Sequence, residues 1–273
     1  MPELEFAAVG DNCIDRFLPP AGDCLVGGNA VNVAVQLAML GRRAGYFGAV
    51  GNDEAGRAVR HALEENAVAI GGLRTDHGLP TAYTDIAISP DGERDFVFEE
   101  FGACAEYRPS AADLAALRMI RHVHIGWLND NGALKLALEG SWATVSQDLS
   151  VNNTPENLSP HGLDIAFCSA DPERVEMEVR NLLAKGAKIV VAMMGASGSL
   201  ASDGRQTVAA SAPLLTPEDT TGAGDAFIAG FLDAFIGGKA IGSCLDRGTE
   251  RAGAACMHRG GFPQSHLKGL VHI

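Results

Sequence analysis

The stretch DTTGAGDAF at residues 219–227 leads into the apolar segment 228–236, so two glycines and a carboxylate stand where a loop becomes a helix. Gly222 and Gly224 allow backbone N–H groups to approach an anion closely, and a helix N-terminus favours negative charge. Asp225 beside such an anion suggests a group that accepts a proton from an attacking hydroxyl. The pattern indicates phosphoryl transfer to an alcohol, although a simple helix cap at Asp225 also fits these residues.

Short apolar strands and amphipathic helices alternate over most of the chain. This alternation predicts an α/β fold with a mainly parallel central sheet between helical layers. We place His122 and His124 on alternate faces of one strand. The expected strands are 6–9, 44–50, 122–125, 143–148, 165–168 and 189–192, and the expected helices are 29–40, 54–65, 111–119, 172–184, 224–236 and 242–258.

One region breaks the alternation. Two β-rich runs at 81–88 and 94–101 flank Ser-Pro-Asp-Gly-Glu at 89–93, a sequence typical of a hairpin turn. Residues 14–18 add a further strand before two prolines. We therefore expect one α/β domain over 1–273 that carries a small β lid formed by 12–24 and 81–106. An antiparallel edge of the main sheet is the alternative.

The composition excludes several classes of protein. The chain has 273 residues and a net charge of −13, which argues against a nucleic-acid-binding or anionic membrane-binding surface. No apolar run reaches the roughly 18 residues of a membrane span, and residues 1–5 are acidic where a secretory signal would be basic. Six scattered cysteines indicate reduced thiols, so a cytoplasmic location is expected.

Two motifs resemble those of a known family. GGNAVNVA at 27–34, followed by GAVGNDEAG at 48–56, resembles the first motif of the ribokinase-like (PfkB) carbohydrate kinases, and 219–227 resembles the second. The resemblance implies a three-layer ribokinase-like fold with a β lid and an ATP-dependent sugar kinase. Within the family, GDNCID at 10–15 and GDAFIAGF at 224–231 are most similar to the fructoselysine 6-kinase branch.

The resemblance assigns roles to individual residues. Asp225 becomes the catalytic base, and the amides of Gly222, Ala223, Gly224 and Asp225 become the anion hole for the transferred phosphoryl group. The residues expected to contact the sugar are Asp11, Asp15, Gly27, Gly28, Asn29, Asn32, Arg94 and Trp127. Five of these residues have a structural alternative: helix capping for Asn29, turn conformation for Gly27 and Gly28, core packing for Trp127 and a solvated edge charge for Arg94. Asp15 could contact either the substrate or solvent.

The nucleotide and metal sites follow from the same resemblance. Gly195, Gly198, Thr220, Thr221 and Gly253 are expected to bind ATP, although Gly195 and Gly198 equally suit a tight turn between strands. Mg²⁺ is expected near Glu173 and Asp148. Ala170 stands where the family has Asn in its Asn-x-x-Glu motif, and Glu173 could instead stabilise a helix dipole. A monovalent cation such as K⁺ beside the anion hole is a further expectation.

The resemblance therefore predicts transfer of the γ-phosphoryl group to a primary hydroxyl of a ketose-type sugar or sugar-amine adduct, with fructoselysine 6-phosphorylation in first place. Alternatives are a ribokinase-, fructokinase- or nucleoside-kinase-like activity, or a sensor that binds sugar or nucleotide without catalysis. A dinucleotide oxidoreductase is excluded because G-x-G-x-x-G is missing after the first strand. The expected partners are the sugar and ATP, neither nucleic acid nor membrane, and a second copy that pairs through the lid.

Overall fold

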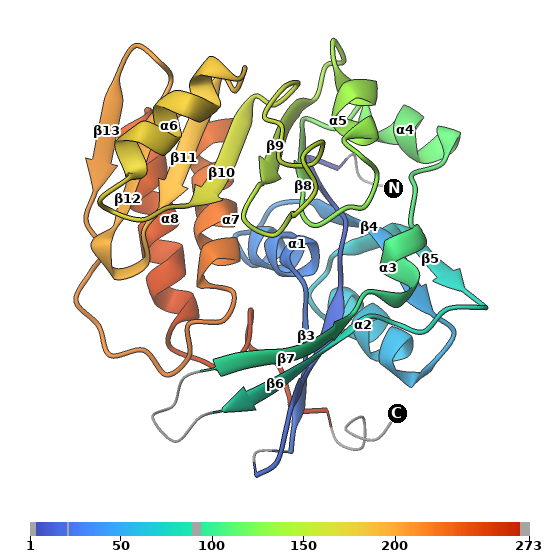
Figure 1. Cartoon of the computed structure of the whole chain (residues 1–273). Helices are drawn as coiled ribbons and strands as arrows, with labels where there is room; N and C mark the ends of the chain where they lie inside the picture. The colour runs from blue at the N-terminus through green and yellow to red at the C-terminus, as the bar shows by residue number, and fades with distance from the viewer. Residues whose placement is uncertain (1–3, 21, 89–93, 268–273) are drawn as a thin grey trace.

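The computed structural model describes residues 4–20, 22–88 and 94–267, and within them the chain forms two sheets and flanking helices (Figure 1). The larger sheet contains β1 (Phe6–Val9), β4 (Ala44–Gly51), β5 (Ala69–Asp76), β8 (His122–Ile125), β9 (Thr144–Asp148), β10 (Ile165–Ser169), β11 (Ile189–Met193), β12 (Ser199–Ser202) and β13 (Thr207–Ala210). Their spatial order is β13-β12-β11-β10-β9-β8-β1-β4-β5. All pairs from β5 to β11 are parallel, whereas β12 and β13 add antiparallel strands, so the predicted mainly parallel sheet is confirmed.

Helices cover both faces of this sheet (Figure 1). One face packs against α1 (Asn29–Met39), α2 (Glu54–Glu65), α7 (Ala223–Ile236) and α8 (Ile241–Ala255). The other packs against α3 (Gly102–Glu106), α4 (Ala111–Leu117), α5 (Ala133–Leu138) and α6 (Val175–Ala184). Central strands are buried on both faces, which explains why β1 is apolar throughout rather than alternating.

A smaller sheet projects from this body as the lid. Its strands are β2 (Cys13–Phe17), β3 (Cys24–Gly27), β6 (Tyr83–Ile88) and β7 (Arg94–Glu100), in the order β3-β2-β6-β7. β2 pairs with β6 in parallel, so the two distant segments form one sheet. The alternative that these runs form an edge of the main sheet is therefore wrong. The hairpin turn expected at 89–93 lies outside the described residues.

Several elements were not expected from the sequence. They are β3, β5, β13, α3, α5 and the 3₁₀ turn η1 (Gly195–Ser197), whereas β12 follows the tight turn between strands that Gly195 and Gly198 also suggested. In β5 the pattern is interrupted by Gly72, because a Cβ there would lie 2.1 Å from the Phe47 ring of the neighbouring strand. In the part of the chain that the structure describes, no helix has the length and apolar character needed to cross a bilayer.

Candidate active site

The loop before α7 is held in place by a buried carboxylate. Asp219 Oδ1 accepts the Thr221 N–H at 2.6 Å, and its Oδ2 accepts the Gly260 N–H at 2.9 Å. Gly222 then adopts a left-handed conformation with φ of 71°, and a Cβ there would lie 2.4 Å from Gly261 Cα. Only glycine fits this close approach, and α7 begins directly after it.

Three backbone amides at the start of α7 have no backbone acceptor within the described residues, namely those of Gly222, Gly224 and Asp225. The Ala223 amide differs because it donates to Thr220 O at 3.2 Å as the turn closes on itself. Three amides rather than the expected four thus remain to bind an anion. They point along the positive end of a 14-residue helix, which is a favourable place for negative charge.

Asp225 lies in the first turn of α7 and faces α1. Its Oδ1 accepts from Asn29 Nδ2 at 2.6 Å, and its Oδ2 accepts from Asn32 Nδ2 at 2.7 Å. The two asparagines are three residues apart on one helix and so share a face. The carboxylate makes no side-chain capping bond to α7, so the simple cap interpretation of Asp225 is not what the structure shows.

Asp11 performs the capping that the sequence suggested for Asn29. Its Oδ2 accepts the Asn29 N–H at 2.7 Å, and its Oδ1 accepts the N–H groups of Ala30 at 3.2 Å and Trp127 at 3.0 Å. Gly28, at φ 102°, brings α1 against the Asn12 backbone, where a Cβ would lie 2.5 Å from Asn12 Cα. The Asn29 side chain is thereby free to turn towards the carboxylates.

Asn29 links two carboxylates directly, because its Nδ2 also donates to Asp148 Oδ2 at 3.0 Å. Burial is the main cause that raises the pKa of Asp225 to about 7. The nearby charges of Asp148 and Asp11 raise it further, whereas the donors Asn32 and Asn29 oppose the increase. Burial also raises the pKa of Asp148 to about 6 and that of Asp11 above its ordinary value. A cluster of this kind favours a proton or a cation.

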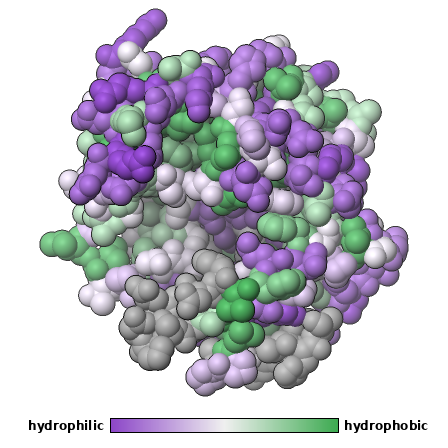
Figure 2. All heavy atoms as spheres, viewed as in Figure 1, coloured by the Kyte–Doolittle hydropathy of each residue, from purple (hydrophilic) through white to green (hydrophobic). Residues whose placement is uncertain are grey.

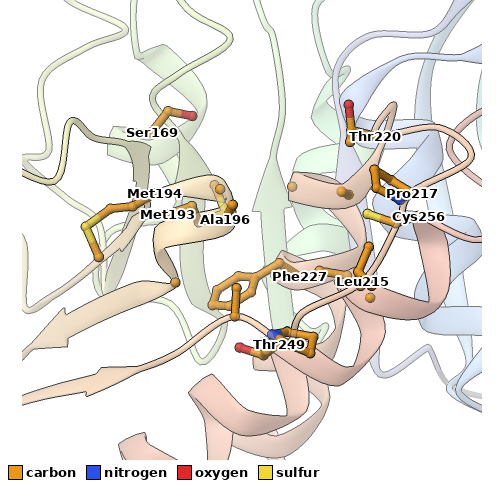
Figure 3. Close-up of a pocket in the computed structure, with 18 of the residues that line it drawn as sticks. Ser169, Met193, Met194, Ala196, Leu215, Pro217, Thr220, Phe227, Thr249 and Cys256 are labelled. Carbon is orange, nitrogen blue, oxygen red and sulfur yellow. The ribbon is translucent and has the colours of Figure 1, made fainter.

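A cavity of about 520 Å³ opens beside the start of α7 (Figure 3). Figure 3 shows Met193, Met194 and Ala196 on one side of it and Leu215, Pro217 and Cys256 on the other. The lining is mainly apolar, as expected of a site for an aromatic base. Among the residues predicted to bind ATP, those that line the cavity are Gly195, Gly198, Thr220 and Gly253, together with Ala223 and Gly224 of the anion loop.

Two of these nucleotide predictions need qualification. Thr221 is not among the cavity-lining residues, since its backbone is tied back to Asp219. Gly198 has φ of 95°, and a Cβ would lie 2.2 Å from Ala210 O, so the turn between strands requires glycine on its own account. The structural interpretation of Gly198 is therefore confirmed, and its contact with ATP stays a prediction.

The remaining predicted sugar contacts lie around the lid. Asp15 is buried on β2, accepts the Cys13 thiol at 3.0 Å, and lies against Gly27, where a Cβ would meet its Oδ2 at 2.6 Å. The Trp127 ring stacks on Phe101 at a centroid distance of 4.0 Å, which joins the main body to the end of the lid. Arg94 begins β7, but its side chain lies outside the described residues.

The two carboxylates predicted to hold a metal, Asp148 and Glu173, lie in different environments. Asp148 is buried, and its Oδ1 accepts the Ser150 N–H at 2.9 Å. Glu173 is exposed before α6, and no hydrogen bond or ion pair of its side chain occurs within the described residues. In the same residues no three His, Cys, Asp or Glu side chains form a metal cage. Mg²⁺ on a nucleotide needs only one or two carboxylates, so buried Asp148 fits such a site, and the metal role of Glu173 stays a prediction.

The placement of the histidines was wrong. Residues two apart in a strand share a face, and both His122 and His124 contact Ser146 Oγ, at 2.8 and 2.9 Å. His124 Nε2 also lies 3.4 Å from Asn29 Oδ1, which brings the pair to the site. The sequence contained a signal: polar residues alternate with apolar ones in HVHI and in the first three residues of TVSQD, although both strands are largely buried.

Known proteins provide an independent comparison. A family model described as pfkB family carbohydrate kinase matches residues 18–161 and 158–265. Fructoselysine 6-kinase of Escherichia coli K12 is 33% identical over 94% of this chain and 98% of that protein, and a fructosamine kinase of Bacillus subtilis is 28% identical over 95% and 93%. Arabidopsis thaliana ribokinase, solved with ribose and ATP, shares the fold with a TM-score of 0.86 at 23% identity, over 94% of each chain.

Proposed function

The chain belongs to the pfkB family of carbohydrate kinases and is an ATP-dependent sugar kinase with a ribokinase-like fold, and on this premise we propose that it phosphorylates the primary 6-hydroxyl of fructoselysine. One observation carries the chemical part of the proposal. Asp225 is fixed by two asparagines beside three amides with no backbone acceptor in the described residues, at the edge of a cavity that suits a nucleotide. The two relatives that act on fructosamine-type sugars support the acceptor.

We assign Asp225 the role of base. Its carboxylate takes the proton of the sugar hydroxyl while the hydroxyl oxygen bonds to the γ-phosphorus, and the bond from phosphorus to the ADP oxygen breaks with its electron pair going to ADP. The amides of Gly222, Gly224 and Asp225 donate to oxygens of the transferred group. A pKa near 7 suits a base that must be ionised and still hold a proton at neutral pH.

The acceptor subsite lies between the main body and the lid. Asp11 Oδ2 keeps a lone pair for a sugar hydroxyl, since the Asn29 N–H is the one bond it accepts among the described residues, whereas Oδ1 accepts two backbone amides. Gly27 and Gly28 let the backbone approach the sugar closely. Asp15 on β2 places a carboxylate next to Gly27, which suits the cationic amine of a sugar-amine adduct. Trp127 lies just after the end of β8, and its ring could contact the same sugar.

Of the two expected cations, Mg²⁺ fits this structure. Asp148 would hold it with the nucleotide phosphates, and the ion would supply neutralising charge to a cluster whose raised pKa values show the effect of burial and mutual repulsion. For the expected monovalent cation, the Asp219 carboxylate already accepts the N–H groups of Thr221 and Gly260, so we derive no role for K⁺ from that carboxylate.

We further propose a homodimer that pairs through the lid. β7 is an end strand of the smaller sheet and exposes Val97 at 58% and Phe98 at 49%. Figure 2 shows hydrophobic spheres gathered over this lower part of the molecule. An apolar edge strand that remains open favours association with a second copy. A cytoplasmic location suits the six free cysteines, which a reducing compartment would preserve.

A panel of acceptors tests the proposal. ADP release would be measured with fructoselysine, fructose, ribose and adenosine at equal concentration, and the phosphorylated carbon would be identified by ³¹P–¹H coupling. We expect fructoselysine to have the highest kcat/KM and its 6-hydroxyl to carry the phosphate. A higher value for ribose, fructose or adenosine would overturn the acceptor, and failure of every candidate would favour a binding protein without catalysis.

A further inference from the structure

A line of polar side chains crosses the apolar layer between the larger sheet and α1. It starts at Thr144 Oγ1, which lies 2.7 Å from His122 Nδ1, and continues from His122 Nε2 to Ser146 Oγ at 2.8 Å. Ser146 Oγ lies 2.9 Å from His124 Nδ1, and His124 Nε2 lies 3.4 Å from Asn29 Oδ1. The line therefore ends on the amide that bridges the two carboxylates of the active site.

The surroundings keep both imidazoles uncharged. His122, His124 and Ser146 are fully buried, and aromatic rings of Phe6 and Phe167 lie 5.9 and 6.1 Å from the two histidine rings. Burial lowers the pKa of both histidines to about 3. Each ring therefore carries one N–H, so each must donate through one nitrogen and accept through the other.

The order of donors along the line follows from its active-site end. Asn29 Nδ2 gives its two hydrogens to Asp148 and Asp225, so Asn29 Oδ1 faces His124 and can only accept. His124 Nε2 must then carry the proton, which makes His124 Nδ1 the acceptor of the Ser146 hydroxyl. Ser146 in turn accepts from His122 Nε2, so His122 Nδ1 can only accept. The Thr144 hydroxyl, which also lies 3.2 Å from Arg121 O, then gives its one hydrogen to His122 Nδ1 at the shorter distance of 2.7 Å. Every donor thus points towards the active site.

We propose that His124, supported by Ser146 and His122, is a positioning residue that holds the Asn29 amide with its N–H groups towards Asp148 and Asp225. The inference rests on the proposed role of Asp225 as base. The oxygen and the nitrogen of the Asn29 side-chain amide are similar in size, so packing alone does not fix which of them faces the carboxylates. If the amide were reversed, its oxygen would lie against the carboxylates of Asp148 and Asp225 and would be repelled by them. A side chain two residues before Gly126 thus acts on the reaction through Asn29 without touching either substrate.

The geometry around Gly126 supports the same conclusion. A Cβ at Gly126 would lie 2.7 Å from Asn29 Oδ1 and 2.7 Å from Asp11 Oδ1. The residue that follows β8 therefore packs closely against the Asn29 amide, and only glycine leaves room for that amide beside His124. The remaining motion of the Asn29 amide is a rotation that exchanges its oxygen and its nitrogen. The hydrogen bond from His124 opposes this rotation.

Nitrogen-15 NMR of the unaltered protein tests the direction of the chain without any mutation. Long-range ¹H–¹⁵N spectra distinguish the two neutral tautomers of imidazole. We expect both His122 and His124 as the Nε2–H form, unchanged between pH 6 and 8. A protonated Nδ1 on His124 would reverse the chain and overturn the inference. This result does not depend on which sugar is the acceptor.

Kinetics test the consequence for the reaction. His124→Phe removes the N–H that donates to Asn29 Oδ1. We expect kcat to fall by about tenfold, the lower end of the loss typical when a residue that orients an active-site group is removed. The affinity for ADP should not change. His124→Gln keeps an N–H near the Nε2 position and should recover most of the loss. Exposed His61→Phe is the control. If folded His124→Phe keeps the parent kcat, or if the Gln and Phe variants are equally impaired, the positioning role is overturned.

The two proposals can fail separately. If the unaltered protein phosphorylates no sugar of the panel, the proposed function fails, and the tautomer of His124 still decides whether the chain is oriented as inferred. If His124→Phe does not fold, the comparison is made between His124→Gln and Ser146→Ala. The inference then requires Gln to retain more of the parent kcat than Ala, and the opposite order would overturn it.

Discussion

Asp225 illustrates how one environment determines both reactivity and pH dependence. Its pKa is raised to about 7, first by burial and then by the charges of Asp148 and Asp11, so the ionised base is lost as the pH falls through about 7. We expect kcat/KM to rise with pH up to that value and then level off. Asp148→Asn removes one negative neighbour and should move the midpoint to lower pH, as a pH–rate profile of both proteins would show. A midpoint that moves upward would contradict this electrostatic account.

The same shift has a consequence for stability. A carboxyl whose pKa is raised binds its proton more tightly in the folded than in the unfolded chain. Asp225 therefore favours folding at low pH, and this contribution is lost as the pH rises from 3.8 to about 7. The active site stabilises the unliganded fold least at the pH where the base works.

At the scale of residues, the sequence predicted which side chains lie together in the site. It did not predict which hydrogen bonds each of them makes. The motifs placed Asp11, Asn29, Asn32 and Asp225 in one site, and the structure brings all four together. The sequence did not predict which side chain caps α1. Either Asp11 or Asn29 could do so, and the path of the backbone between them decides that it is Asp11. Gly28 sets that path through its left-handed φ of 102°.

At the scale of elements, a buried lysine joins α5 to the loop between β9 and β10. Lys135 is 3% exposed, and its Nζ donates to the carbonyl oxygens of Glu156 and Ser159. Lys135→Met leaves these carbonyls without a buried donor, so we expect a loss of about 1–3 kcal/mol in the free energy of unfolding. Urea titration would measure it, with exposed Lys185→Met as the matched control. Equal stability of the two variants would show that the loop does not depend on this ammonium group.

The elements missed from the sequence are short or interrupted. α5 spans six residues, fewer than two turns, so its periodicity is too brief to recognise. β5 lies at the edge of the larger sheet and contains adjacent glycines, one of which makes room for Phe47. Long periodic elements such as α1, α2 and α7 were predicted to within about two residues. Their apolar faces are set by the sheet that they cover, which the sequence pattern reflects directly.

At the scale of the molecule, the sequence predicted that the central sheet is mainly parallel. It did not predict how the strands of the lid pair with one another. β2 and β6 are separated by more than sixty residues in the chain and pair in parallel, a long-range contact with no local sequence signal. The lid's exposed edge nevertheless allows a prediction about assembly. Val97→Lys places a charge on the apolar edge strand and should convert the proposed dimer to a monomer, as measured by light scattering.

Met119→Lys serves as the control for this test, because Met119 is also exposed, at 67%, but lies after α4 and away from the lid. The control should keep the mass of the parent protein. A parent that is monomeric at every concentration, or a Val97→Lys variant that still dimerises, would contradict pairing through β7.

The central claim is that the Asp225 carboxylate takes the proton while the adjacent amides hold the transferred phosphoryl group, and Asp225→Asn tests it most directly. Asn32 Oδ1 has no partner in the described structure, so the Asn32 amide can turn to accept from the new side chain and the fold should persist. We expect kcat to fall by about a thousandfold, with the ADP dissociation constant within about threefold of the parent value. Turnover comparable to that of the parent, in a variant that still binds ADP, would contradict the account.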